Sequence, residues 1–217
     1  MDRRLFVSAA LGGAGALGAG LSLASAAKAE PLLTATPDDM TMGNPHAPVT
    51  VIEYASASCP HCARFNNEIF PAFKATYIDT GRVFYVFREF LTQPVSLAGA
   101  AFLVARRAGR ANYFKVLDEV FHDQQHIYQT GDIMAGLNRA GAVAGLDEKA
   151  VKAALEDDKA TKALNDRMDL YLSRDKVTGT PTFFVGGARL DGEQTLAQLD
   201  TAIVAAEKKT KTRKRRR

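Results

Sequence analysis

Residues 49–62 read Val-Thr-Val-Ile-Glu-Tyr-Ala-Ser-Ala-Ser-Cys-Pro-His-Cys, and this stretch decides the fold. Its first part, Val49–Tyr54, is rich in β-branched and apolar residues, which is typical of a buried strand. A short polar segment leads to Cys59-Pro60-His61-Cys62, and a helical pattern follows to about Thr80, with a break near Pro71. Pro60 suits a first helical turn, because the N–H that proline lacks would have no partner there. The stretch therefore predicts a strand, a short loop and a helix that begins at the two cysteines.

The chain on either side of this stretch predicts a sheet that is interrupted by helices. Met40–Gly43 predicts a short edge strand and Val83–Phe87 a second buried strand, which gives the order β-α-β. Residues 94–177 lack strand signals and show helical spacing, with Asp132 and Asp147 as N-caps of two helices. The apolar stripe of a longer helix in this part comprises Leu164, Met168, Tyr171 and Leu172.

Strand signals return near the end of the chain. Thr182–Val185 predicts a strand, Gly186-Gly187 a two-residue hairpin turn, and Ala188–Leu190 the return strand. The whole pattern predicts one α/β domain over residues 30–207, with an inserted all-helical subdomain at about 94–177. A last helix places four apolar residues on one side, Leu196, Leu199, Ile203 and Ala206.

Cys59 and Cys62 are the only cysteines among the 217 residues. A disulfide between residues three positions apart closes a very short loop and adds little stability, so chemistry explains the pair better. At the start of a helix, free backbone amides and the helix dipole stabilise a thiolate on the first cysteine. We therefore predict that Cys59 is the exposed nucleophile and Cys62 the largely buried resolving thiol. His61 is expected to add positive charge beside Cys59.

Zinc binding and haem attachment fit the two cysteines less well. A structural zinc site needs four ligands, and the chain has no second cysteine pair; His122 and His126 fit a solvated helix face. Covalent haem attachment needs a histidine directly after the second cysteine, where this chain has Ala63. The Gly-rich run at 12–20 has no strand before it, so it is not a phosphate loop. We therefore expect neither a metal nor a cofactor.

Residues 1–29 have the pattern of a secretory signal peptide. Arg3 and Arg4 precede a weakly apolar run, and Ala27-Lys28-Ala29 has the small residues of a cleavage site before Glu30. A membrane anchor is the alternative, although glycines dilute the apolar run. The paired arginines also fit a twin-arginine export signal. We therefore expect a mature protein that begins at Glu30 and works in the periplasm.

The net charge of +4 is unevenly distributed along the chain. The basic tail at 208–217 carries a charge of +8 and the leader at 1–29 a charge of +2, which leaves −6 for residues 30–207. The high isoelectric point therefore belongs to the tail rather than to a binding face of the domain, and we expect no nucleic-acid partner. We expect the tail to be a disordered, solvated end, and the alternative is a segment that touches anionic membrane or nucleic acid. We also expect the lead-in at 30–39 to be flexible.

Together, these features resemble the DsbA-like thiol-disulfide oxidoreductases of the thioredoxin superfamily. The matching features are the strand at Val49–Tyr54, the Cys-Pro-His-Cys motif that opens a helix, the helical insertion, and Thr180-Pro181 before a strand. The resemblance covers about residues 40–206. It implies a thioredoxin-like fold and the oxidation of reduced exported proteins. It also implies reoxidation by a membrane partner that passes electrons to quinone.

The resemblance also implies roles for three further residues. Pro181 matches a cis-proline that faces the active-site disulfide, and Thr180 would offer its backbone to an extended substrate. The alternative for Pro181 is an ordinary trans proline in a turn. Glu53 matches a buried acid that exchanges a proton with Cys62, and the alternative is an ordinary acid at a strand end.

Two rival functions stay open on the sequence alone. Thr180 before the proline is also found in disulfide isomerases and reductases of the superfamily, so isomerisation or reduction is the first rival. Those isomerases usually carry an N-terminal dimerisation domain, and residues 30–48 are too short for one, so we expect a monomer. The second rival is a non-catalytic holdase or metal-handling protein that uses the groove only for binding.

Overall fold

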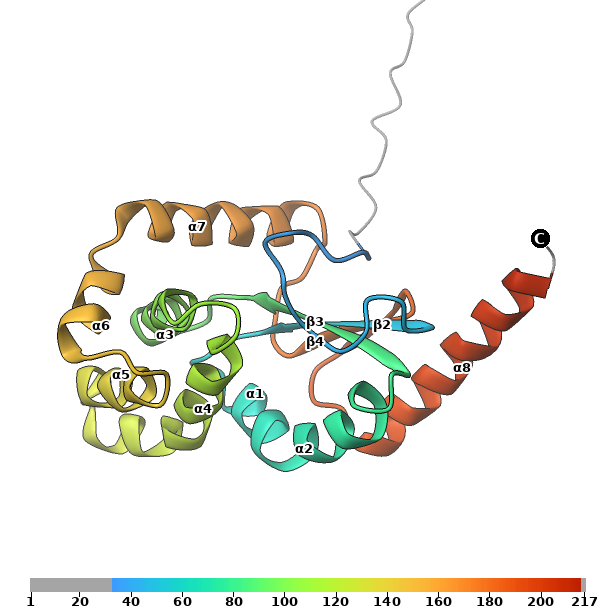
Figure 1. The fold of residues 1–217 in the computed structure, drawn as a ribbon, viewed down its shortest axis with the longest axis horizontal. Helices are drawn as coiled ribbons and strands as arrows, with labels where there is room; N and C mark the ends of the chain where they lie inside the picture. The colour runs from blue at the N-terminus through green and yellow to red at the C-terminus, as the bar shows by residue number, and fades with distance from the viewer. Residues whose placement is uncertain (1–32, 216–217) are drawn as a thin grey trace, which may run out of the picture.

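The computed structural model describes residues 33–215 and the side chains as far as residue 212. A mixed five-stranded sheet with the order β1-β3-β2-β4-β5 forms its centre (Figure 1). The central strands β2 and β3 are parallel, and the other neighbouring pairs are antiparallel. The strands are β1 (Met40–Met42), β2 (Val49–Ala55), β3 (Val83–Glu89), β4 (Thr182–Val185) and β5 (Ala188–Asp191). The edge strand, the buried strands and the hairpin turn at Gly186-Gly187 are confirmed.

The helical segment after the cysteines is continuous from Pro60 to Ile78. It comprises α1 (Pro60–Arg64), the π-helical turn η1 (Phe65–Ile69), α2 (Phe70–Phe73) and the π-helical turn η2 (Lys74–Ile78). Pro71 has no N–H to give to the preceding turn. The wider turn before it lets the Phe70 N–H bond to the Phe65 carbonyl, so the predicted break near Pro71 takes the form of a π-turn.

Five helices occupy the chain between β3 and β4, and α3 to α6 form a body beside the sheet (Figure 1). Asp132 and Asp147 cap α5 and α6, as predicted, by accepting bonds from the backbone amides of Ala135 and Ala150. Asp157 caps α7 in the same way, which we did not predict. The helices are α3 (Val95–Arg107), α4 (Tyr113–Thr130), α5 (Ile133–Ala142), α6 (Glu148–Leu155) and α7 (Asp158–Ser173).

Helices cover both faces of the sheet. The segment Pro60–Ile78 and α8 (Leu196–Arg215) pack below the sheet in Figure 1, and α7 lies above it. Leu199 and Ile203 of α8 are fully buried, as predicted. Leu164 and Tyr171 of α7 are also buried, but Leu172 is 42% exposed, so the predicted stripe was wrong at that residue. Leu172 follows Tyr171 directly, and adjacent residues on a helix point in different directions.

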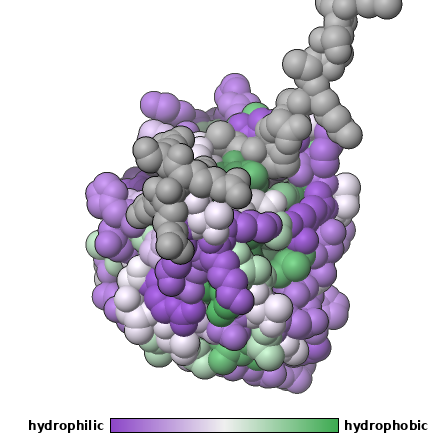
Figure 2. All heavy atoms as spheres, turned by 90° about the vertical axis from the view of Figure 1, so that its right-hand side faces the viewer, coloured by the Kyte–Doolittle hydropathy of each residue, from purple (hydrophilic) through white to green (hydrophobic). Residues whose placement is uncertain are grey.

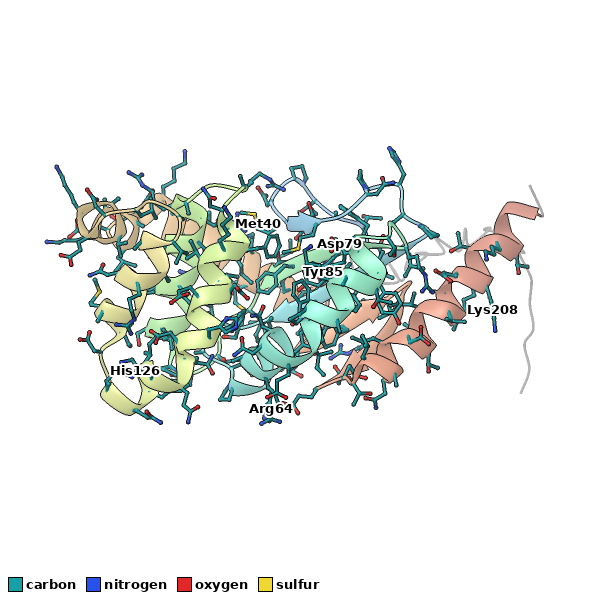
Figure 3. The ribbon with its side chains drawn as sticks, turned by 60° about the horizontal axis from the view of Figure 1, so that its bottom comes forward. Met40, Arg64, Asp79, Tyr85, His126 and Lys208 are labelled. Atoms are coloured by element: carbon teal, nitrogen blue, oxygen red, sulfur yellow. The ribbon has the colours of Figure 1, made fainter. Side chains whose placement is uncertain are left out.

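The structure corrects two expectations about the ends of the domain. The lead-in is anchored: Asp39 is buried and forms an ion pair with Arg88, and Arg88 also bonds to the Thr34 carbonyl. The basic tail begins as a continuation of α8, which runs on to Arg215 instead of becoming disordered at Lys208. Lys208 lies on the part of α8 that projects beyond the sheet (Figure 3). The face toward this end is largely hydrophilic (Figure 2).

The predicted signal peptide at 1–29 lies outside the described residues. Among the helices of residues 33–215, none combines the length and the apolar character that crossing a bilayer requires.

Candidate dithiol site

Cys59 and Cys62 lie where β2 ends and α1 begins. Cys59 has an extended backbone and is the N-cap of α1, and Pro60 occupies the first turn. The helix is anchored there, because the Ala63 N–H bonds to the Cys59 carbonyl at 3.0 Å. Both thiols are free. Cys62 is 1% exposed, as predicted, but Cys59 is also largely covered, at 7%, because it faces the loop before β4.

The two thiols have opposite acidities. The pKa of Cys59 is lowered from 9.0 to about 5, chiefly because the Cys62 thiol can donate a hydrogen bond to the thiolate. Thr180 and the backbone amides of Cys62 and His61 add to this effect, while burial opposes it. Burial raises the pKa of Cys62 well above 9.0, and the nearby charges of Cys59 and Glu53 raise it further. One thiolate and one thiol are therefore the expected state of the reduced pair at neutral pH.

His61 contributes to the site through its backbone more than through its side chain. The sequence predicts that its side chain adds positive charge beside Cys59. Instead, the ring is 59% exposed and its Nδ1 lies 2.6 Å from Glu193 Oε1, on the loop before α8. The His61 backbone N–H stabilises the Cys59 thiolate. This difference arises because Glu193 is far from His61 in the sequence, and its approach is set by the tertiary fold.

Glu53 lies beneath the dithiol, within strand β2. It is 2% exposed and accepts a 2.5 Å hydrogen bond from the Tyr85 hydroxyl of β3. Burial raises its pKa from 4.5 to about 8, and the negative charge of Cys59 adds to the rise, whereas the bond from Tyr85 lowers it. A carboxyl group in this state can both give and take a proton near neutral pH.

A cavity of about 310 Å³ connects Glu53 and Cys62 with the surface. Both residues line its inner part, and the exposed Lys115 and Asp118 of α4 line its outer part. Tyr85 lies between the sheet and the helical segment that covers it (Figure 3). The remaining wall is mostly aromatic, with Phe65, Phe70, Phe87, Phe114 and Phe121.

The loop before β4 faces Cys59. The Thr180–Pro181 peptide bond is cis, as the resemblance implied, and the Cys59 Sγ lies 3.4 Å from the Thr180 carbonyl oxygen. The Thr180 hydroxyl is buried and has no hydrogen-bond partner among the described residues. It is therefore available to donate a bond to a thiolate at Cys59. A second cis bond, Gln93–Pro94, precedes α3 and was not predicted.

Two residues of α4 hold the loop before Cys59, and the sequence predicts neither of them. Gln124 is buried, and its side-chain amide donates to the carbonyl of Ala57 at 2.8 Å and to that of Cys59 at 3.4 Å. Tyr128 donates to the Ser58 carbonyl. These partners lie at least 65 residues apart in the sequence. Local sequence patterns contain no signal that could have identified them.

The two histidines that were considered as zinc ligands both lie on α4. His122 and His126 lie on an exposed part of α4, and Figure 3 shows His126 at the far end of that helix. In residues 33–215, no group of three or more His, Cys, Asp or Glu side chains is arranged to hold a metal ion.

The geometry as a whole defines a class of protein. A dithiol at the start of a helix faces a cis-proline loop, with a buried acid beneath it, on a mixed sheet that carries a helical insertion. This arrangement is that of a thioredoxin-like thiol-disulfide protein.

Comparisons with known proteins identify the family. A family model described as Thioredoxin matches residues 35–205. A Rickettsia bellii protein, provisionally named a protein-disulfide oxidoreductase, is 32% identical over 176 residues, which cover 79% of this chain and 67% of the relative. A similarly named protein of Rickettsia typhi is 36% identical over 155 residues, 71% of this chain and 57% of the relative. The chain thus spans about three fifths to two thirds of these relatives.

A solved structure extends the likeness to three dimensions. The crystal structure of Wolbachia pipientis alpha-DsbA1 is 27% identical and superposes with a TM-score of 0.76, over 84% of this chain and 97% of that one. The predicted thioredoxin-like α/β fold with a helical insertion is confirmed. The chain belongs to the thioredoxin family, within its DsbA-like protein-disulfide oxidoreductases.

Proposed function

We propose that the protein introduces disulfide bonds into exported proteins, by exchange through the Cys59–Cys62 disulfide. The observation that carries the proposal is the stabilised thiolate of Cys59, whose pKa is about 5. A stabilised thiolate favours the reduced form of the pair, so the disulfide form is a strong oxidant.

The proposed reaction has two exchange steps. A thiolate of the substrate attacks the Cys59 sulfur, the Cys59–Cys62 bond breaks, and its electron pair leaves on Cys62. Glu53, which is largely protonated below about pH 8, supplies the proton for Cys62. A second substrate thiolate then attacks the substrate sulfur of the mixed disulfide and releases Cys59 as a thiolate. The substrate is oxidised by two electrons and the protein pair is reduced by two.

The remaining site residues have supporting roles in this proposal. Pro60 starts the helix whose amides stabilise the Cys59 thiolate, and His61 provides one of those amides. Thr180 and Pro181 form the wall against which an extended substrate binds, by pairing with the exposed backbone beside Cys59.

The setting of the reaction is also proposed. The leader at 1–29 supports export to the periplasm and cleavage before Glu30, with the paired arginines in favour of the twin-arginine route. The protein would act as a monomer and be reoxidised by a quinone-linked membrane protein. Because Thr180 precedes the cis-proline, one alternative function stays open, that of a disulfide isomerase or reductase that is maintained in the reduced state.

A redox titration tests the proposal. The mature protein, from Glu30 onward, is equilibrated with glutathione buffers, and its thiols are counted by alkylation; Cys59→Ser is the control that cannot exchange. A potential well above about −270 mV, the value of cytosolic thioredoxins, is expected for an oxidase. A potential near that value would move the assignment to a reductase or isomerase. A pair that never equilibrates with glutathione would overturn thiol exchange altogether.

A further inference from the structure

The loop between β5 and α8 carries an acidic residue that the proposed reaction does not use. Glu193 Oε1 lies 2.6 Å from His61 Nδ1 and 2.8 Å from Arg64 Nη1, and its Oε2 accepts a bond from Arg64 at 2.9 Å. All three side chains are partly exposed, and Arg64 lies on the lower surface of the molecule in Figure 3. The cluster is therefore a surface feature that directly adjoins the dithiol.

These contacts fix the orientation of the His61 ring. An ionised carboxylate only accepts hydrogen bonds, so the Nδ1 that faces Glu193 carries the hydrogen. The groups that contribute most to stabilising the Cys59 thiolate are the Cys62 thiol, Thr180 and two backbone amides. The His61 side chain is thus close to Cys59 in the sequence but makes its hydrogen bond to Glu193 rather than to the Cys59 sulfur.

A His61 imidazole that no longer bonds to Glu193 would have a different effect on the Cys59 thiolate. Without this bond, the exposed His61 side chain is free to adopt its other rotamers. A positive imidazolium near a thiolate stabilises it, and a more stable thiolate makes the disulfide a stronger oxidant.

We propose that Glu193 is a positioning residue that holds His61 away from Cys59 and thereby limits the oxidising strength of the Cys59–Cys62 disulfide. This inference rests on the proposed function, because it assigns a control element to the same dithiol. Glu193 does not touch the reacting sulfurs, and its effect passes through the His61 ring. The loop that carries Glu193 leads into α8, so the position of this helix helps to set the redox strength of the pair.

The test is the redox equilibrium of the purified protein with glutathione at pH 5.5. Glu193→Gln is expected to favour reduction of the pair about threefold, the size of effect typical of exposed charged contacts. Glu68→Gln is the matched control, because Glu68 is an exposed acid beside the same surface cleft that Glu193 lines. It should leave the equilibrium unchanged.

A double variant separates positioning from a direct effect of charge. In a His61→Ala background, Glu193→Gln should have no effect, because the ring that it releases is absent. An unchanged equilibrium in the single variant, or an equal shift in the His61→Ala background, would overturn the inference. A wild-type pair that does not exchange with glutathione would overturn the proposed function instead, so the two failures are distinguishable. Thermal unfolding of each variant verifies that the fold is retained.

Discussion

The Tyr85 hydroxyl donates a 2.5 Å hydrogen bond to the Glu53 carboxylate, across the parallel pair of central strands. Both side chains are almost completely buried. Burial alone would keep a carboxyl group protonated far above its ordinary range. The bond favours the ionised form, so it partly offsets burial and keeps the pKa of Glu53 at about 8. Tyr85 therefore tunes the group that is proposed to exchange protons with Cys62.

Removal of the Tyr85 hydroxyl should raise the pKa of Glu53. In Tyr85→Phe, nothing replaces the donor that stabilises the ionised carboxylate, so its titration should move upward from about 8. The carboxyl carbon signal of Glu53 in a pH series of NMR spectra measures this directly. Tyr77→Phe is a matched control, since that hydroxyl bonds to Asp200 instead. A Glu53 titration that is the same in Tyr85→Phe and wild type would contradict the assignment.

Replacement of the acid itself should slow the exchange. Glu53→Gln keeps the size of the side chain but cannot deliver a proton to the departing Cys62 thiolate. We expect the attack of a dithiol peptide on the oxidised protein to slow about 100-fold at pH 7, the usual range for loss of a general acid. Stopped-flow fluorescence of a labelled peptide measures the rate. Equal rates in variant and wild type would show that Cys62 obtains its proton by another route.

The titrations of Glu53 and Cys59 should change the stability of the reduced protein in opposite directions as the pH rises. The folded pKa of Glu53 is raised from 4.5 to about 8, so its contribution to stability is lost as the pH rises through this range. The folded pKa of Cys59 is lowered from 9.0 to about 5, so its contribution is lost as the pH falls from 9 toward 5. In Glu53→Gln, only the effect of Cys59 remains.

Urea unfolding of the reduced protein checks this expectation. Between pH 5 and 8, the free energy of unfolding of Glu53→Gln should increase with pH more steeply than that of the wild type. Parallel curves for the two proteins would mean that Glu53 does not change its protonation state on unfolding.

The reduction potential should change its pH dependence where Cys59 titrates. Below about pH 5, reduction of the disulfide takes up two protons, and the potential should fall by about 59 mV per pH unit. Above that pH, only Cys62 takes up a proton, and the slope should become about 30 mV per pH unit. A glutathione titration from pH 3.5 to 7 covers the change. A single slope of about 59 mV throughout would contradict a stabilised Cys59 thiolate.

Loss of the Thr180 hydroxyl should weaken the oxidant. Thr180→Val removes a donor that helps to stabilise the Cys59 thiolate, so the pKa of Cys59 should rise and the reduction potential should fall. The ultraviolet absorbance of the thiolate, followed against pH, gives the first quantity. Thr182→Val is the control, because that hydroxyl bonds to the Gly179 carbonyl and to Asp191. An effect of equal size in both variants would point to distortion of the loop.

The features that the sequence predicted well are local ones. β2, the dithiol at the helix start, and the caps at Asp132 and Asp147 each depend on residues that lie within a few positions of one another. Gln124 and Glu193 also contact the site, but they are separated from their partners by 65 or more residues. No periodic pattern reports such contacts, because they depend on how the helical insertion and the last loop pack against α1.

The wrong expectations have a similar cause. Asp39 resembles a solvated lead-in residue until the tertiary structure places Arg88 beside it. The basic run after Lys208 resembles a solvated tail by composition, yet Thr210 of the same helix still bonds to the Pro48 carbonyl. In both cases, a segment that is distant in the sequence contacts these residues.

The length of α8 has a consequence for the electric dipole of the whole molecule. The helix begins just after the loop that carries Glu193 and rises about 30 Å over its 20 residues, through the basic run that begins at Lys208. Residues 30–207 are net acidic, so positive and negative charge are separated along one axis. Near an anionic surface, this dipole exerts a torque that turns the basic end inward. The same torque directs the dithiol outward, toward proteins that approach from solution.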